Sequence, residues 1–556
     1  MATLEVTAYV TDTEDGPRLS AGIGFPGGLL TRDEAQQLAD LWRTALEGLA
    51  RHAERPDAGG LTPSDVPLVK VSQRDLEVWT ESHPGLVDVW PVTPMQSGLL
   101  FHSMMADSSF DAYHVQLTFH LSGDVDPERM RRAGQVLLDR YPNLGAAFVT
   151  SAAGEPVQLI RERVELPYKV VDLRDLSDAA RDAELERLLA ADHADHFDPA
   201  KPPLMRLTLV LMEPGRSELV FTASHALYDG WSIPHLLQDL IRAYGTDGDT
   251  SELPRVRPYR DFLTWLAGQD RDTSVRAWAA ELDGVDTPTM LAGAGADAAG
   301  DDEGGFGSAE VPLSTETSRL LSQRAAELGV TLNVLVQGTW GVLLGALTGR
   351  QDVVFGTTVS GRPPQVPGVD DMVGLFINAL PVRVRYSPED TLAQVLTRLQ
   401  QSQAVLMDHQ NHGLSDIQDA AGLGTLFDTM VVFESYPIDR AGLVEAHDEA
   451  GIAITGARPV TGAHYPMGVA AEASPHLRTG LHYQESLFDP ATAARIAAGL
   501  GRLLEQLAAD PETPLGRLDL MPKAELERVV AAWNDTVTPA AVLTVQEAFA
   551  EQAAQG

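Results

Sequence analysis

The sequence has no cysteine, which excludes disulfide bonds, thiolate metal ligands and a cysteine nucleophile. No apolar run reaches about 18 residues, and no basic segment leads into a short apolar one at the start, so we predict no membrane span, no secretory signal and a cytoplasmic location. Basic residues are scarce: 41 lysines and arginines stand against 79 aspartates and glutamates, a net charge of -38. This charge argues against nucleic acids and anionic membranes as partners.

The chain is long enough for several packed cores. It has 556 residues, of which 44% are apolar and 22% charged, and its length suggests about three to four units of about 150 residues. Residues 56–87 are enriched in proline, glycine and serine and are predicted to form a linker with one short helix. No glycine-rich phosphate loop followed by lysine is present, so ATP binding is not indicated.

An internal repeat joins the two ends of the chain. Leu19–Phe25 recurs without gaps as Leu477–Tyr483, and the same register aligns Thr31 with Asp489. Each copy predicts a strand, a turn, a helix N-cap and an amphipathic helix. Since the first copy has no matching domain in front of it, residues 1–55 are predicted to be the tail of a preceding domain of the same kind.

The most informative segment is Ser224–Ser232, with the sequence SHALYDGWS. The alternating pattern before it predicts a strand that ends near His225, and Ser232 is the predicted N-cap of the following helix. A histidine at a strand end is held by the sheet yet open to a cleft. Asp229, with a glycine and a helix start beside it, is suited either to hold this loop or to act as a base.

Two other interpretations of nearby residues are weaker. Ser224 is a poor candidate nucleophile, because neighbouring side chains in a strand point to opposite faces and no Gly-x-Ser-x-Gly turn surrounds it. The acidic and histidine residues of His193–Asp198 are explained by a helix end before a proline, so no metal site is predicted.

Ser224–Ser232 resembles the HHxxxDG active-site motif of the condensation domains of nonribosomal peptide synthetases, with serine in place of the first histidine. Further segments are similar to the other motifs of this family, in the family's order, over roughly residues 88–520. These segments are Pro91–His102, Arg140–Phe148, Tyr259–Trp265, Met372–Arg383, His409–Gln410, Leu426–Glu434 and His464–Pro466.

The resemblance implies an α/β (α+β) fold of two chloramphenicol-acetyltransferase-like lobes, 88–270 and 271–520. Each lobe is expected to be a mixed sheet with helices, and the two to form a V around a central tunnel. Residues 1–55 resemble the C-terminal tail of an epimerization domain, and 521–556 resemble a linker and the start of an adenylation domain. Both ends therefore look like parts of neighbouring domains.

The resemblance also implies a reaction, in which the amine of an acceptor aminoacyl group attacks a donor peptidyl thioester. Thr93–Gln96 and Phe427–Thr429 resemble the subclass that accepts a donor ending in a D-residue. The implied site residues are catalytic His225, the structural residues Asp229, Arg362 and Ser224, and the substrate-binding residues Gly230, Trp231 and Asn378. Asp229 and Arg362 are expected to form a buried pair between the lobes.

No cofactor is expected on the chain itself, because upstream donor and downstream acceptor carrier proteins would supply the phosphopantetheine arms. A monomer is expected. Two rival functions stay open: an epimerase of the same fold, for which no Glu-Gly-His-Gly segment is found, and a catalytically impaired docking platform that recruits a tailoring enzyme, which the serine at position 224 motivates.

Overall fold

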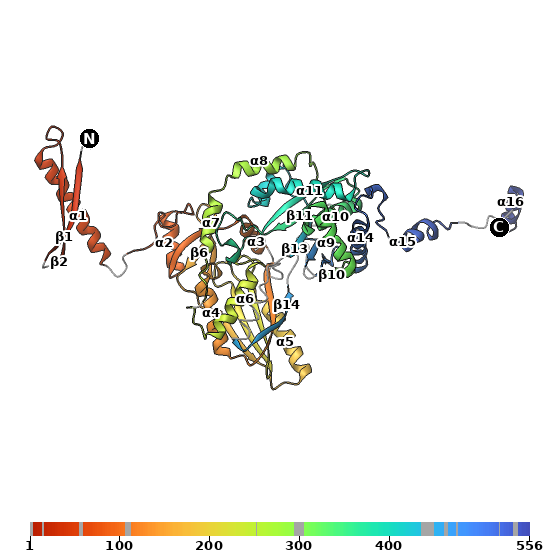
Figure 1. Ribbon diagram of the computed structural model, residues 1–556, viewed down its shortest axis with the longest axis horizontal. Coiled ribbons are helices and arrows are strands. Elements are labelled where there is room, and N and C mark those ends of the chain that lie inside the picture. Colours follow the sequence, from red (N-terminus) through yellow and green to blue (C-terminus); the bar gives the residue numbers. More distant parts are fainter. Residues whose placement is uncertain are drawn as a thin grey trace.

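The computed structural model describes most of the chain and shows two α/β lobes side by side (Figure 1). The N-terminal unit and the last helices extend from opposite ends of this body. The described residues are 4–13, 16–54, 59–105, 113–251, 253–293, 305–434, 450–460, 465–473, 476–521, 523–536 and 543–555. His464 of the last motif lies outside them.

The first lobe contains a five-stranded sheet, ordered β14-β4-β9-β8-β7, and a three-stranded sheet, ordered β3-β6-β5. Its own strands are β3 (Leu86–Pro91), β4 (His114–Ser122), β5 (Ala147–Thr150), β6 (Pro156–Arg161), β7 (Tyr168–Asp172), β8 (Met205–Glu213) and β9 (Arg216–Ser224). Its helices are α2 (Gln73–Ser82), α3 (Pro94–Met105), α4 (Pro127–Arg140), η1 (Pro142–Gly145), α5 (Asp178–His193), α6 (Ser232–Gly245) and α7 (Tyr259–Ala267).

The second lobe contains a six-stranded mixed sheet, ordered β10-β16-β15-β13-β11-β12. Its strands are β10 (Phe306–Glu310), β11 (Asp352–Val359), β12 (Asn378–Arg385), β13 (Thr429–Glu434), β15 (Met467–Glu472) and β16 (Arg478–Gln484). Its helices are α8 (Arg271–Glu281), α9 (Thr315–Leu328), α10 (Leu332–Thr348), η2 (Val369–Asp371), α11 (Leu392–Leu406), η3 (Met407–His409), α12 (Leu414–Ala420), α14 (Pro490–Ala509) and η4 (Leu515–Arg517). A large apolar core surrounds Trp340, which is fully buried.

Two segments from the second half of the chain belong in space to the first lobe. Strand β14 (Ala453–Val460) pairs antiparallel with β4 at the edge of the five-stranded sheet, and Figure 1 shows it as a blue strand among orange and yellow ones. Val369, Val373 and Phe376 are buried in the core of the first lobe. The predicted boundary at 270/271 therefore falls between α7 and α8 along the chain, but the lobes exchange material across it.

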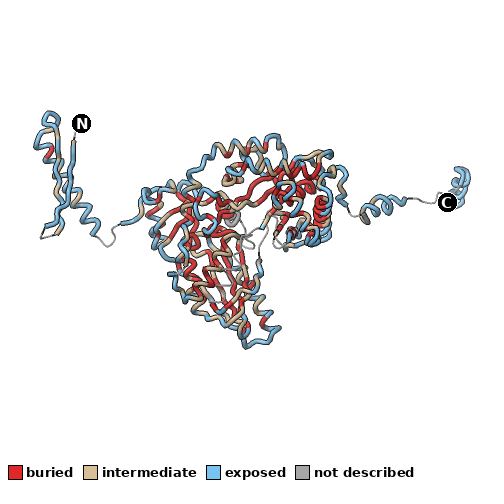
Figure 2. Tube along the Cα trace, in the orientation of Figure 1, coloured by how far each residue is buried: buried red, intermediate tan, exposed pale blue. Residues whose placement is uncertain are grey.

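The N-terminal unit repeats the strand and helix of the second lobe, as predicted. It consists of β1 (Glu5–Thr13), β2 (Gly16–Gly24) and α1 (Arg32–Ala53). Thr31 caps α1 in a reciprocal capping box, and Asp489 caps α14 with proline in its first turn. The N-terminal unit is almost wholly exposed, whereas each lobe has an interior of buried residues (Figure 2).

The predicted linker is partly folded. Leu76 and Trp79 of α2 are buried against the three-stranded sheet, so this helix is part of the first lobe. At the other end, α15 (Lys523–Glu527), η5 (Arg528–Ala532) and α16 (Val545–Gln555) extend from the body and contain no buried residue among those whose burial is described.

Within the described part of the chain, no individual helix combines the length and the apolar character that a membrane span requires. Helices α9 and α10 meet both criteria only as a pair, and they are bent by 101° at their junction.

Candidate active site

The loop that follows β9 holds the histidine singled out in the sequence. Strand β9 lies between β4 and β8, and it ends at Ser224 as predicted. The His225 N–H donates to the carbonyl of Tyr113 at 2.8 Å, which continues the strand contact by one residue. The side chain of His225 is half-buried. The imidazole is thus carried by the central region of the sheet rather than by a free loop.

A hydrogen bond from the His225 side chain to a backbone carbonyl fixes which ring nitrogen carries the proton. Its Nδ1 lies 2.8 Å from the carbonyl oxygen of Tyr228, and a carbonyl only accepts, so Nδ1 must donate. In the neutral ring Nε2 then keeps its lone pair, and it has no hydrogen-bond partner among the described residues. The Tyr228 ring lies nearly parallel to the imidazole, 6.0 Å between centroids, and burial raises the pKa of Tyr228.

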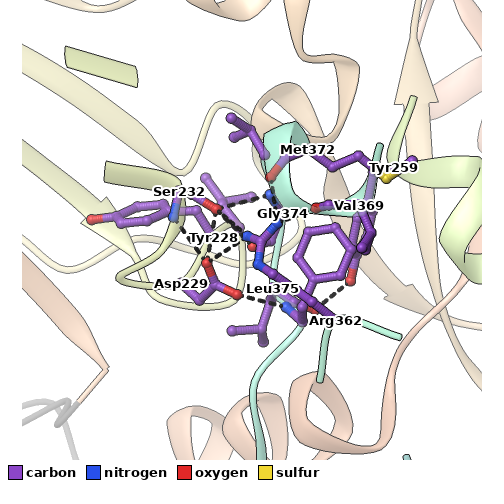
Figure 3. Close-up of polar contacts among 12 residues, drawn as sticks. Tyr228, Asp229, Ser232, Tyr259, Arg362, Val369, Met372, Gly374 and Leu375 are labelled. Atoms are coloured by element: carbon purple, nitrogen blue, oxygen red, sulfur yellow. Dashed lines mark hydrogen bonds and ion pairs between the residues drawn. The ribbon is translucent and has the colours of Figure 1, made fainter. Parts of the chain in front are cut away.

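Asp229 is completely buried, and both its carboxylate oxygens are used (Figure 3). Oδ1 accepts from the Ser232 N–H at 3.0 Å, from the Ser232 hydroxyl at 2.9 Å and from Arg362 Nη2 at 3.1 Å. Oδ2 accepts from the Phe376 N–H at 3.0 Å. A carboxylate with this many donors and no solvent is suited to hold structure, because its lone pairs are not available to a substrate.

Arg362 closes the pair from the second lobe. Its side chain is 2% exposed, and its Nη1 donates to the carbonyls of Val369 and Met372. The guanidinium lies 4.0 Å from the centroid of the Phe376 ring. The expected pair between Asp229 and Arg362 is therefore present and buried, and the two Nη groups of Arg362 are hydrogen-bonded while its ring contact is with an aromatic face.

The segment 373–376 joins the lobes almost residue by residue. The carbonyl of Gly374 accepts from the Asp229 N–H at 3.1 Å, and its N–H donates to the Ser232 hydroxyl at 3.1 Å. The Tyr259 hydroxyl donates to the carbonyl of Leu375 at 2.5 Å. Burial, with the charge of Asp229 adding to it, raises the pKa of Tyr259, so this phenol remains a donor.

Two glycines permit this close approach. A Cβ on Gly374 would lie 2.3 Å from the Tyr259 ring, and a Cβ on Gly361 would lie 1.8 Å from the carbonyl oxygen of Phe376. Gly361 also has a φ of +60°, which favours glycine. A side chain at either position would collide with these atoms, so the local backbone would have to shift.

The other predicted site residues have different surroundings. Ser224 makes no hydrogen bond to His225; its hydroxyl accepts from the Ala226 N–H and it lines a small pocket with Leu100 and Leu204. Gly230 and Trp231 follow Asp229 and are half-buried. Asn378 is 5% exposed.

The Asn378 amide donates to the carbonyls of Gln410 and His412. Both of its N–H groups are thereby used, and these contacts give no support to the prediction that Asn378 binds substrate.

The sequence interpretation of Ser232 requires correction, and one partner was missed. Ser232 is the first residue of α6 rather than its N-cap, and its hydroxyl is used for contacts with Asp229 and Gly374. Tyr259 lies in a segment that the resemblance singled out, but no role was assigned to it. Its only sequence signal was membership of that segment.

Two α/β lobes joined at a buried ion pair, with an imidazole at a strand end of the first lobe, match the two-lobed fold of the chloramphenicol-acetyltransferase type. Residues 87–530 match the family model described as "Condensation domain". The chain belongs to the condensation-domain family of nonribosomal peptide synthetases, whose members form peptide bonds.

Relatives among characterised proteins are components of peptide synthetases. The chain is 33% identical to a component of the linear gramicidin synthase of Brevibacillus parabrevis over 531 residues, which are 93% of this chain and 10% of that protein. It is 30% identical to a component of the mycosubtilin synthase of Bacillus subtilis over 547 residues, 97% of this chain and 21% of that protein. The chain thus spans only a small part of the curated relatives that it matches.

Solved structures agree on the fold. The first condensation domain of the calcium-dependent antibiotic synthetase, in complex with a substrate analogue, gives a TM-score of 0.62 at 18% identity, covering 77% of this chain and 98% of that one. The X-domain in its complex with OxyB from teicoplanin biosynthesis gives a TM-score of 0.65 at 20% identity, covering 78% of this chain and 96% of that one.

Proposed function

We propose that this chain forms an amide bond between two tethered substrates, an acceptor aminoacyl group and a donor peptidyl thioester. Phosphopantetheine arms on two carrier proteins would bring them to the lobe junction. The observation that carries the proposal is the state of His225: its Nδ1–H is held by the Tyr228 carbonyl, and Nε2 has no hydrogen-bond partner among the described residues. Such a nitrogen can accept a hydrogen bond from an incoming amine.

The chemical step needs no further reactant. The acceptor nitrogen attacks the thioester carbonyl carbon, the C–N bond forms, and the resulting intermediate collapses with cleavage of the C–S bond. The proton lost by nitrogen passes through Nε2 of His225 to the departing sulfur. The products are an amide and a free thiol.

Alignment contributes more to this reaction than proton transfer. An α-amino group has a pKa of about 7.7–8.0, so roughly 10–17% of it is already unprotonated and nucleophilic at pH 7. Orienting the two reactants can lower the barrier by about 7–11 kcal/mol, against about 3–5 kcal/mol for a proton-transferring residue worth roughly 10²–10⁴-fold. His225 therefore acts chiefly by holding the amine.

The neighbouring residues have supporting roles. Asp229 and Arg362 hold the loop, and Ser224 is a packing residue on the opposite face of the strand. Gly230 and Trp231 contact substrate, and the Gly230 N–H is a candidate donor to the oxyanion. Their support is position: both come directly after the buried Asp229 and precede α6.

The finer identity of the donor rests on sequence resemblance. Thr93–Gln96 and Phe427–Thr429 favour a donor that ends in a D-residue. Asp428 is 3% exposed, and its two carboxylate oxygens accept from the N–H groups of Leu291 and Ala292 at 2.8 Å. These two hydrogen bonds fix the backbone of residues 291 and 292 against the second of the two motifs. Coupling of D-ending and L-ending donors, measured in parallel, tests the assignment.

The test of the main proposal compares two histidines of similar exposure. His225→Ala should lower amide formation from aminoacyl thioesters on carrier proteins by about 10²–10⁴-fold. His83→Ala is the control, because His83 is also half-buried and also contacts a carbonyl, that of Ala200. Product is measured by mass spectrometry.

Equal product from wild type and His225→Ala would exclude the catalytic assignment. Racemised donor without coupling would favour an epimerase, and binding of a tailoring enzyme without either activity would favour a docking platform. The likeness to the X-domain concerns the fold and does not by itself favour the platform.

We infer further that residues 1–55 are the last strand and helix of another condensation-type lobe, from an epimerization domain, and that 521–556 lead into an adenylation domain. Support for the first comes from the repeat: Leu49 is 65% exposed, whereas Leu507, its counterpart, is fully buried. Deleting residues 1–55 should leave amide formation and the melting temperature of the body unchanged. A loss of either would contradict the assignment.

A further inference from the structure

The three carbonyls that follow His225 are each held by a side-chain N–H. The carbonyl of Tyr228 accepts from His225 itself. The carbonyl of Ala226 accepts from Gln96, and that of Leu227 accepts from Asn143. Gln96 lies in α3 and Asn143 in η1, and the proposed reaction gives neither side chain a role of its own.

Gln96 is fixed at both ends of its amide group. Its side chain is buried, with the residue 1% exposed. Oε1 accepts from the Thr93 N–H at 2.9 Å and from Gln158 Nε2 at 3.1 Å. These two donors determine the orientation of the amide, so Nε2 points at the carbonyl of Ala226, 2.8 Å away. The amide therefore has one orientation and presents a donor to the loop.

Asn143 links the same loop to the segment 373–376, which comes from the second half of the chain. It is 3% exposed, and its Nδ2 donates to the carbonyl of Leu227 at 3.3 Å and to the carbonyl of Val373 at 3.2 Å. One amino group thus uses its two hydrogens on two carbonyls, one in the histidine loop and one in the segment 373–376. The position of this loop is coupled to the position of the segment 373–376.

We propose that Gln96 and Asn143 are positioning residues that set the tautomer and orientation of His225. The peptide planes at 226 and 227 determine where the Tyr228 carbonyl points, and this carbonyl keeps the proton on Nδ1. Which imidazole nitrogen is protonated depends on the hydrogen bond that the other nitrogen makes. If the planes turn, the ring loses its acceptor and its proton moves to Nε2, the nitrogen that the reaction needs unprotonated.

Gln96→Met and Asn143→Leu remove the donors while keeping similar volume. The matched control is Gln116→Met, because Gln116 is also 1% exposed and also donates to a carbonyl, that of Leu189 in α5, away from the loop. Gln96→Met is expected to lower kcat about 10- to 100-fold, with the acceptor KM within about twofold of wild type. Gln116→Met is expected to leave both unchanged.

A second readout does not depend on activity, because the kinetic test rests on the proposed function. Two-bond ¹H–¹⁵N spectra of the full chain report the tautomer of each of its 15 histidines, and His225→Ala assigns the signal of interest. Wild type should show the Nδ1–H pattern, and Gln96→Met and Asn143→Leu should show a mixture. Gln116→Met should match wild type.

The outcomes separate the two ideas. An unchanged His225 signal in both loop variants, with kcat equal to that of Gln116→Met, would overturn the positioning role. A wild type without amide-forming activity would overturn the proposed function, while the tautomer spectra still decide the role of Gln96 and Asn143. If one loop variant does not fold, the other carries the same test.

Discussion

The repeated strand–helix unit occurs in two settings, packed in the second lobe and exposed at the N-terminus. The contrast shows how much of a helix's stabilisation depends on burial against neighbouring elements. In the second lobe, the helix α14 buries ten residues against its neighbours. In the N-terminal unit, the helix α1 buries one, Ala35. Both helices have the predicted caps and the predicted periodicity. The sequence of each unit therefore encodes its local structure, whereas the energy that a side chain contributes depends on what covers it.

The largest loss of unfolding free energy is expected at the buried ion pair between Asp229 and Arg362. Arg362→Met leaves Asp229 buried without its cation, which should cost about 3–5 kcal/mol of unfolding free energy. Arg174→Met is the control, because Arg174 and Asp172 form the same type of pair with both side chains about half exposed, and exposed pairs contribute about 0–1 kcal/mol. Chemical denaturation measures both. Equal losses would show that cover is not the deciding variable.

Truncation of a buried leucine should cause the second-largest loss of unfolding free energy. Leu507→Ala in α14 leaves a cavity in the main core of the second lobe, and such truncations cost about 2–5 kcal/mol. The same denaturation experiment measures it. A cost below that of exposed positions would mean that this part of the core relaxes around the missing atoms.

Burial should also change how the free energy of unfolding responds to a fall in pH. His412 is 6% exposed, and burial lowers its pKa despite Asp416 nearby. The unfolded chain then binds the proton more readily, so this contribution to stability is present above pH about 6.5 and is lost as pH falls through the folded value.

His412→Gln should therefore flatten the loss of unfolding free energy between pH 7 and 5, by at most about 1.4 kcal/mol per pH unit. Denaturation midpoints across this range measure the slope. An identical slope in the variant would assign the acid sensitivity to other groups.

The smallest effect is expected in the N-terminal unit. Leu49→Ala changes the same residue type at the position equivalent to Leu507, but Leu49 is 65% exposed. The main transition should shift by no more than about 0.5 kcal/mol. A shift comparable to that of Leu507→Ala would mean that the N-terminal unit packs on the body in solution.

Much of the fold could be predicted because the signals were local. The end of β9, the caps at Thr31 and Asp489, and the pair of Asp229 with Arg362 all follow from short patterns or from the order of motifs. The partners of Gln96 and Asn143 could not be predicted in this way. The Gln96 amide reaches a carbonyl 130 positions along the chain, and the Asn143 amide reaches carbonyls 84 and 230 positions along it. No local periodicity encodes such contacts.

The exchange between lobes was also beyond local reasoning. A strand such as β14 carries no mark of which sheet it will join, because pairing satisfies the same backbone groups in either sheet. The contacts of Asn378 illustrate the same limit. Its side chain type suits substrate binding, but tertiary packing directs both donors to the carbonyls of Gln410 and His412.

Strand β14 makes the two halves of the chain topologically inseparable. A fragment ending at residue 270 would lack the strand that covers β4, leaving a row of unpaired backbone groups open to self-association. A fragment starting at 271 would carry that strand with no sheet to receive it. Mixing the two fragments should therefore restore a soluble heterodimer, in which β14 of one fragment pairs with β4 of the other.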